Sequence, residues 1–103
     1  MTERRTVRAT LEFFAALDRQ LPAERTATKP SRGDFQAYEL LRLVEEFATG
    51  WDQMPEVIHG RSEYRVLITN GRLVPMISVT GQLAPDGAIE LIELELDLSG
   101  PWE

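Results

Sequence analysis

Three carboxylates that alternate near the C-terminus, Glu93, Glu95 and Asp97, are the first candidates for chemistry. In a β-strand, alternate side chains share one face and lie about 7 Å apart. Such a row can bind a divalent cation or a basic partner. A metal site would also need a histidine or a carboxylate from another element. We interpret the row as a solvent-facing strand that resists aggregation, and as a surface for a basic partner.

Three arginines, Arg61, Arg65 and Arg72, flank or lie within an earlier predicted strand. A cluster of guanidinium groups can bind phosphate or carboxylate. The alternative is pairing with acidic neighbours. If Arg65 shares the open face with the carboxylate row, cross-strand pairs contribute under about 1 kcal/mol each.

His59 is the only histidine, and the chain has no cysteine. A lone histidine without thiolates makes no zinc site, so neither a metal nor a cofactor is predicted. General acid–base catalysis by His59 stays a candidate role. Trp102 either folds back on the core or contacts a partner.

Length, charge and composition narrow the class of protein. A chain of 103 residues predicts one domain, residues 1–103. The net charge is −6, and residues 34–103 carry thirteen acidic and four basic residues. Direct nucleic-acid binding is therefore disfavoured, because phosphates require a basic face. The absence of cysteine, of a signal peptide and of a membrane-length apolar run favours a cytoplasmic protein.

Hydrophobic spacing predicts helices in the first half of the chain. A short strand at about 4–9 runs into a helix at about 10–20, with Thr10 as N-cap and Pro22 ending the segment. Residues 22–33 form a linker by composition. A second helix follows, capped by Ser31 or Asp34. Its predicted apolar stripe comprises Ala37, Leu40, Leu41, Val44 and Ala48, widened by Phe47.

Alternation predicts three strands in the last third. The pair Asn70-Gly71 indicates a two-residue type I′ hairpin leading into a strand at about 72–80. A second turn falls at residues 84–87. The last strand, about 88–98, places Ile92, Leu94, Leu96 and Leu98 on one face. The predicted class is α+β, a short strand and helical hairpin packed on a C-terminal antiparallel meander.

This pattern resembles the RelE/ParE superfamily of type II toxin–antitoxin toxins. The resemblance rests on FFAALDRQLP, on PEVIHGRSEYRVLITNG and on the order of elements over residues 5–98. It implies a RelE/ParE-like fold in the bacterial cytoplasm and a cognate antitoxin that lies across the toxin. It also implies the ribosome or gyrase as the target, because one branch cleaves mRNA on ribosomes and another poisons gyrase.

The closing strand, ELIELELDL, distinguishes between these activities. RNA-cleaving relatives are basic and carry basic residues and a histidine or tyrosine near this strand, whereas here it is acidic. The hypothesis is therefore a toxin-like protein that binds a macromolecular target without catalysis. The alternatives are a ribosome-dependent endoribonuclease using Arg61, Arg65 and Arg72, or a non-toxic interaction module, which is a candidate homodimer through a sheet edge.

Overall fold

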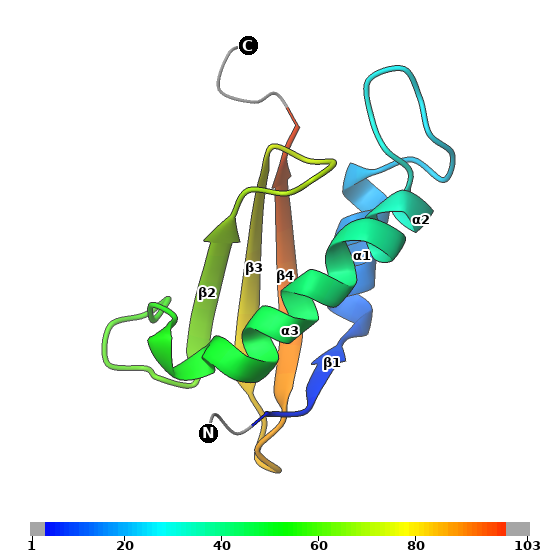
Figure 1. Cartoon of the computed structure of the whole chain (residues 1–103). Helices are drawn as coiled ribbons and strands as arrows, with labels where there is room; N and C mark the ends of the chain where they lie inside the picture. The colour runs from blue at the N-terminus through cyan, green and yellow to red at the C-terminus, as the bar shows by residue number, and fades with distance from the viewer. Residues whose placement is uncertain (1–3, 99–103) are drawn as a thin grey trace.

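The computed structural model describes residues 4–98, in which helices pack on one face of a four-stranded sheet (Figure 1). The strands are β1 (Val7–Ala9), β2 (Tyr64–Thr69), β3 (Met76–Leu83) and β4 (Ile89–Asp97). They lie in the order β1-β4-β3-β2. The last three strands form an antiparallel meander, and β1 adds to β4 in parallel, which makes the whole sheet mixed. The predicted α+β class is confirmed.

The first helix, α1 (Leu11–Gln20), begins and ends where its sequence predicts. Thr10 is the N-cap, and its hydroxyl oxygen accepts a hydrogen bond from the Phe13 N–H at 3.3 Å. Leu21 is extended, because a residue that precedes a proline avoids the helical region. No helix within residues 4–98 is long and apolar enough to cross a membrane.

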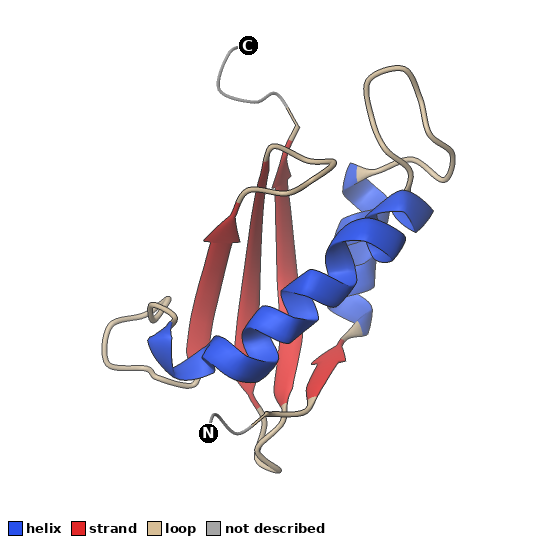
Figure 2. Ribbon diagram, in the orientation of Figure 1, coloured by secondary structure: helices blue, strands red, loops and turns tan. Residues whose placement is uncertain are grey.

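The second helical segment runs without a break but changes its winding (Figure 2). It comprises α2 (Arg32–Phe35), the π-helical turn η1 (Gln36–Leu40), α3 (Leu41–Gly50) and the 3₁₀ turn η2 (Trp51–Gln53). Ser31 caps it, and Asp34 completes a capping box by accepting from the Ser31 N–H at 3.0 Å. The helix therefore begins inside the stretch that composition assigned to a linker.

The π-turn changes which side chains of this segment are buried. Leu41, predicted to be in the apolar stripe, is 72% exposed. Ala48 of the predicted stripe is buried, and the other buried side chains recur every four residues: Phe35, Glu39, Leu43, Phe47 and Trp51. In a regular α-helix a strict four-residue repeat drifts around the axis, since a turn takes 3.6 residues. The wider π-turn takes up one more residue and offsets that drift.

The core lies between the helices and the inner face of the sheet, which is the face they cover. Phe13 of α1, Phe47 of α3 and Leu91 of β4 belong to one buried cluster. Both helical segments therefore share a single core.

The link between β2 and β3 differs from the predicted hairpin. β2 ends at Thr69 and β3 begins at Met76, so residues 70–75 form a longer loop. Neither Asn70 nor Gly71 has a positive φ, which a type I′ turn requires. The predicted two-residue turn is wrong.

The link between β3 and β4 is a tight turn, as predicted. The Ala84 N–H donates to the Ala88 carbonyl at 2.8 Å, and the Gly87 N–H donates to the Ala84 carbonyl at 2.9 Å. Gly87 has a φ of 88°, a conformation that side chains disfavour.

A β-bulge interrupts the regular alternation that was predicted for the last strand. Thr80 pairs with Glu93 but Gly81 pairs with Leu91, so Ile92 is an extra residue in β4. Before the bulge Ile89 and Leu91 face the core, and after it Leu94 does. Because of the bulge, odd-numbered residues before it and even-numbered residues after it face the same core.

Candidate functional site

The carboxylates predicted to bind a partner lie on the outer face of the sheet, the face opposite the helices. Glu93 and Glu95 stand across from Thr80 and Ser78 of β3, and both are exposed. Asp97 is also exposed and stands at the end of the same row. In residues 4–98 no three metal-ligating side chains gather closely enough to hold an ion. Trp102, the fourth predicted partner-binding residue, lies outside the described residues.

The outer face is apolar along β2 and acidic along β4. Tyr64 and Val66 are half-buried there, and Ile68 is 63% exposed. Met76 at the start of β3 is 39% exposed. Because the helices pack on the opposite face (Figure 2), this surface is open across strands β2 to β4.

Arg65 faces the core and does not share the open face with the carboxylates. It pairs with Gly81, whose β4 partner Leu91 is buried. Its guanidinium donates to the carbonyls of Met54 at 2.9 Å and Asp52 at 3.2 Å and lies 5.5 Å from the centre of the Trp51 ring. Arg65 therefore fastens the end of the helical segment to β2, and cross-strand pairing with the acidic row is wrong.

The other candidate catalytic residues do not converge with Arg65 on one site. Arg61 forms an ion pair with Glu63, and its hydrogen bond holds the pKa of that carboxyl below its usual value. His59 is exposed in the same loop. Arg72 lies beyond the other end of β2, about 20 Å away along a six-residue strand. A single catalytic centre cannot include Arg61 and Arg72 at that separation.

Residues 1–33 carry seven basic and four acidic residues, and most of the arginines in this region form ion pairs. Arg4 bonds Glu45 through two 2.6 Å hydrogen bonds, and Arg8 bonds Asp86 at 3.0 Å. These hydrogen bonds lower the pKa of both carboxyls. Arg25 pairs with Asp34 in the same way. A phosphate would have to compete with carboxylates for these guanidinium groups.

Sequence reasoning missed the buried carboxylate of Glu39 in the π-turn. Its side chain is fully buried, and Oε2 accepts from the Leu73 N–H at 2.8 Å. Arg42 lies 3.5 Å from the other oxygen and donates to the Asn70 carbonyl at 3.1 Å. The helical segment is thus hydrogen-bonded to the β2–β3 loop at Asn70 and at Leu73. The available signal was a glutamate four residues from both Phe35 and Leu43 on an apolar repeat.

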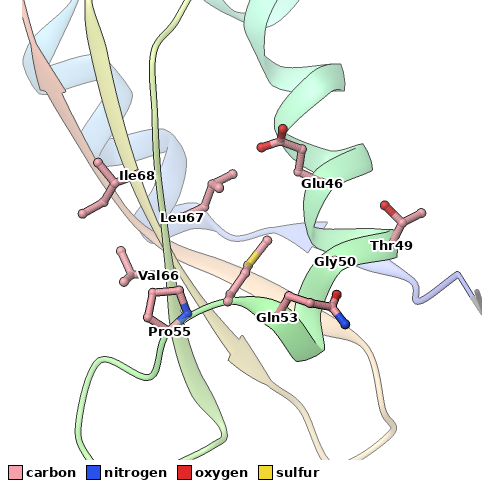
Figure 3. Close-up of a pocket in the computed structure, with 9 residues that line it drawn as sticks. Glu46, Thr49, Gly50, Gln53, Pro55, Val66, Leu67 and Ile68 are labelled. Carbon is pink, nitrogen blue, oxygen red and sulfur yellow. The ribbon is translucent and has the colours of Figure 1, made fainter.

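An open groove of about 430 Å³ separates α3 from β2. Its walls include Glu46 and Thr49 of the helix, Met54 and Pro55 of the following loop, and Leu67 of the strand. Figure 3 shows Glu46 and Leu67 directed toward each other from opposite walls. Oε2 of Glu46 is shielded from solvent and has no hydrogen-bond partner within residues 4–98. The groove therefore combines apolar walls with one unpaired acceptor.

No family model, curated protein or solved structure matches this chain. The resemblance to RelE/ParE toxins stays a prediction.

Proposed function

We propose that this protein is a toxin-like component of a bacterial type II toxin–antitoxin pair that acts by binding and not by catalysis. The observation that carries the proposal is the open outer face of the sheet, apolar on β2 and acidic on β4. An uncovered face of this kind favours contact with another macromolecule. The ribosome and gyrase are the targets that the family resemblance suggests.

The cognate antitoxin would present a basic segment to this face. Glu93 and Glu95 supply the complementary charge, which speeds encounter and selects against acidic partners. Apolar side chains of the antitoxin would cover Ile68 and Met76, the most exposed apolar residues of the face. The placement of Arg61 and Arg72 at opposite ends of β2 favours binding over RNA cleavage by an arginine cluster.

Expression of the full chain in a bacterium tests the proposal. We expect arrested growth, restored by co-expression of the cognate antitoxin. Normal growth at high expression would contradict toxicity and favour the non-toxic interaction module. Primer extension on translating ribosomes separates binding from mRNA cleavage, and cleavage that Arg72→Ala abolishes would favour the endoribonuclease.

Charge reversal on the outer face tests the surface itself. The double variant Glu93→Lys, Glu95→Lys should weaken binding to the antitoxin at least tenfold, as measured by calorimetry. Glu24→Lys is a control for one such charge reversal away from the face, because Glu24 is exposed in the loop between α1 and α2. Equal affinity for the double variant and the control would exclude the acidic row from the interface.

A further inference from the structure

Only half of the free edge of β2 is paired. The Val66 N–H donates to the Pro55 carbonyl at 3.1 Å, and the Val57 N–H donates to the Tyr64 carbonyl at 3.0 Å. Since alternate residues of a strand direct their backbone groups to the same edge, the Val66 carbonyl and both groups of Ile68 also point outward. Residues 55–57 do not reach them, and none of these three groups bonds a loop backbone group within residues 4–98.

The unpaired edge adjoins the groove between α3 and β2. Val66, Leu67 and Ile68 line both features (Figure 3). A segment that pairs with the edge would therefore direct alternate side chains into the groove and onto the outer face. The position facing the groove would meet Leu67 and Met54 along its stem and Glu46 at its end.

We propose that this half-edge binds an extended segment of a partner protein in which a lysine or arginine is flanked by β-branched apolar residues. The aliphatic stem of the basic residue covers the apolar walls of the groove while its charged end reaches Oε2 of Glu46. The flanking residues pack on the outer face beside Ile68, which is 63% exposed. The backbone of the segment bonds the Val66 carbonyl and Ile68 in strand addition.

Charge favours a different protein over a second copy of this chain as the occupant. Two copies each carry a net charge of −6 and repel one another. Self-pairing through β2 would also bring Leu67 or Thr69 to the groove, and neither is basic. The basic residue of β2, Arg65, already donates to the carbonyls of residues 52 and 54.

The charge on Glu46 is only partly compensated by its own helix. Its other oxygen, Oε1, lies 3.9 Å from Nη1 of Arg42, beyond hydrogen-bond distance. Arg42 is instead hydrogen-bonded to Glu39 and to the Asn70 carbonyl. Glu46 therefore retains the capacity for a charge-assisted hydrogen bond from a partner.

Selection from a display library of random seven-residue peptides, with the full chain as bait, tests the inference. We expect enriched peptides to share a lysine or arginine between valine or isoleucine residues. In an NMR titration the best synthetic peptide should shift the amide signals of Val66, Leu67 and Ile68. Glu46→Gln should weaken that peptide about tenfold, because a charge-assisted hydrogen bond is lost.

Two variants separate the edge from the groove. Ile68→Pro removes an outward N–H and should abolish binding. Glu46→Lys leaves the edge intact and should change the selected central residue from basic to acidic, which keeps the inference testable if Ile68→Pro does not fold. Glu93→Lys, an equal charge change on the outer face, should leave peptide affinity unchanged.

Several results would overturn the inference: no enrichment, an enriched set without a basic residue, or binding that survives both variants. Loss of binding in Glu93→Lys alone would assign the peptides to the acidic row. Concentration-dependent dimerisation that Ile68→Pro abolishes would make a second copy the occupant. The inference does not require toxicity, so a chain that fails the growth test can still bind peptide at β2.

Discussion

The two loops that connect the strands of the meander are held in place in different ways. The β3–β4 turn is held by bonds within residues 84–88, and its Gly87 has the positive φ that a tight turn needs. The β2–β3 loop is held from outside, by Glu39 and Arg42 of the helical segment. Local sequence specifies the first link, whereas the second depends on a side chain more than thirty residues earlier.

This difference bears on function because the β2–β3 loop holds one end of β2. The edge of that strand carries the proposed peptide site, and its outer face carries the apolar half of the proposed partner surface. A π-turn often marks a functional position in a helix. Here it directs Glu39 into the core, where the carboxylate fixes the loop and hence the end of the strand.

Removal of the buried Glu39 carboxylate, which holds the β2–β3 loop, should destabilise the fold most. Glu39→Ala leaves the Leu73 N–H without its acceptor and removes the carboxylate that pairs with Arg42. We therefore expect a loss of about 3 kcal/mol in the free energy of unfolding. Urea denaturation measures it. Glu39→Gln keeps an acceptor for Leu73 and should cost less, while Glu45→Ala on the exposed side should change stability little. Equal losses for Glu39→Ala and Glu45→Ala would mean that the loop is not held by the helix.

Addition of one methyl group to the β2–β3 loop, at Gly71, should cause the next largest loss of stability. A Cβ at Gly71 would lie 2.5 Å from Oε2 of Glu39 and would also collide with the Val74 carbonyl oxygen. We expect Gly71→Ala to cost about 2 kcal/mol through overpacking, measured by thermal unfolding. The matched control is Gly33→Ala, where the nearest atom is 3.7 Å away. A neutral Gly71→Ala would show that loop and helix can separate.

The same substitution in the β3–β4 turn should cost less and for another reason. Gly87 has open space around a Cβ, so only its φ of 88° opposes a side chain. We expect Gly87→Ala to lose about 1 kcal/mol. Gly87→Asn should lose less, because asparagine tolerates this region better. If alanine and asparagine were equally costly, backbone conformation would not be the cause.

The smallest effect concerns pH and the ion pair beside the β3–β4 turn. The hydrogen bond from Arg8 lowers the pKa of Asp86. A lowered folded pKa gives stability that is present above the unfolded value of about 3.9 and is lost as pH falls through the folded value. Arg8→Ala should therefore be slightly less stable than the natural chain at neutral pH. Urea titrations should show this difference shrink as pH falls below about 3.9 and vanish once Asp86 is protonated in the folded state. A difference that persists after that protonation would exclude the ion pair as its source.

The predictable parts of the fold are those with local causes. Thr10 and Pro22 bound α1 through a cap and a steric restriction, and residues 84–87 form a turn through their own bonds. Asn70-Gly71 is an equally strong local signal, but the hairpin it predicts is wrong. A glycine is required at Gly71 by its closeness to Glu39 and not by a positive φ. The candidate site was predicted in part: alternation placed Glu93 and Glu95 together, but it did not place Arg65.

The sequence by itself determined the α+β class, the order of elements and the acidic row of β4, because periodicity and turn chemistry act over a few residues. Tertiary structure alone decided that Arg65 faces Trp51, that Glu39 holds a distant loop and that Glu46 borders an unpaired strand edge. Each of these contacts depends on the π-turn or on strand pairing, because these set the orientation and register of segments that are distant in the sequence. The contacts of these side chains are made with residues distant in the sequence, and a pattern over a few neighbouring residues cannot predict them.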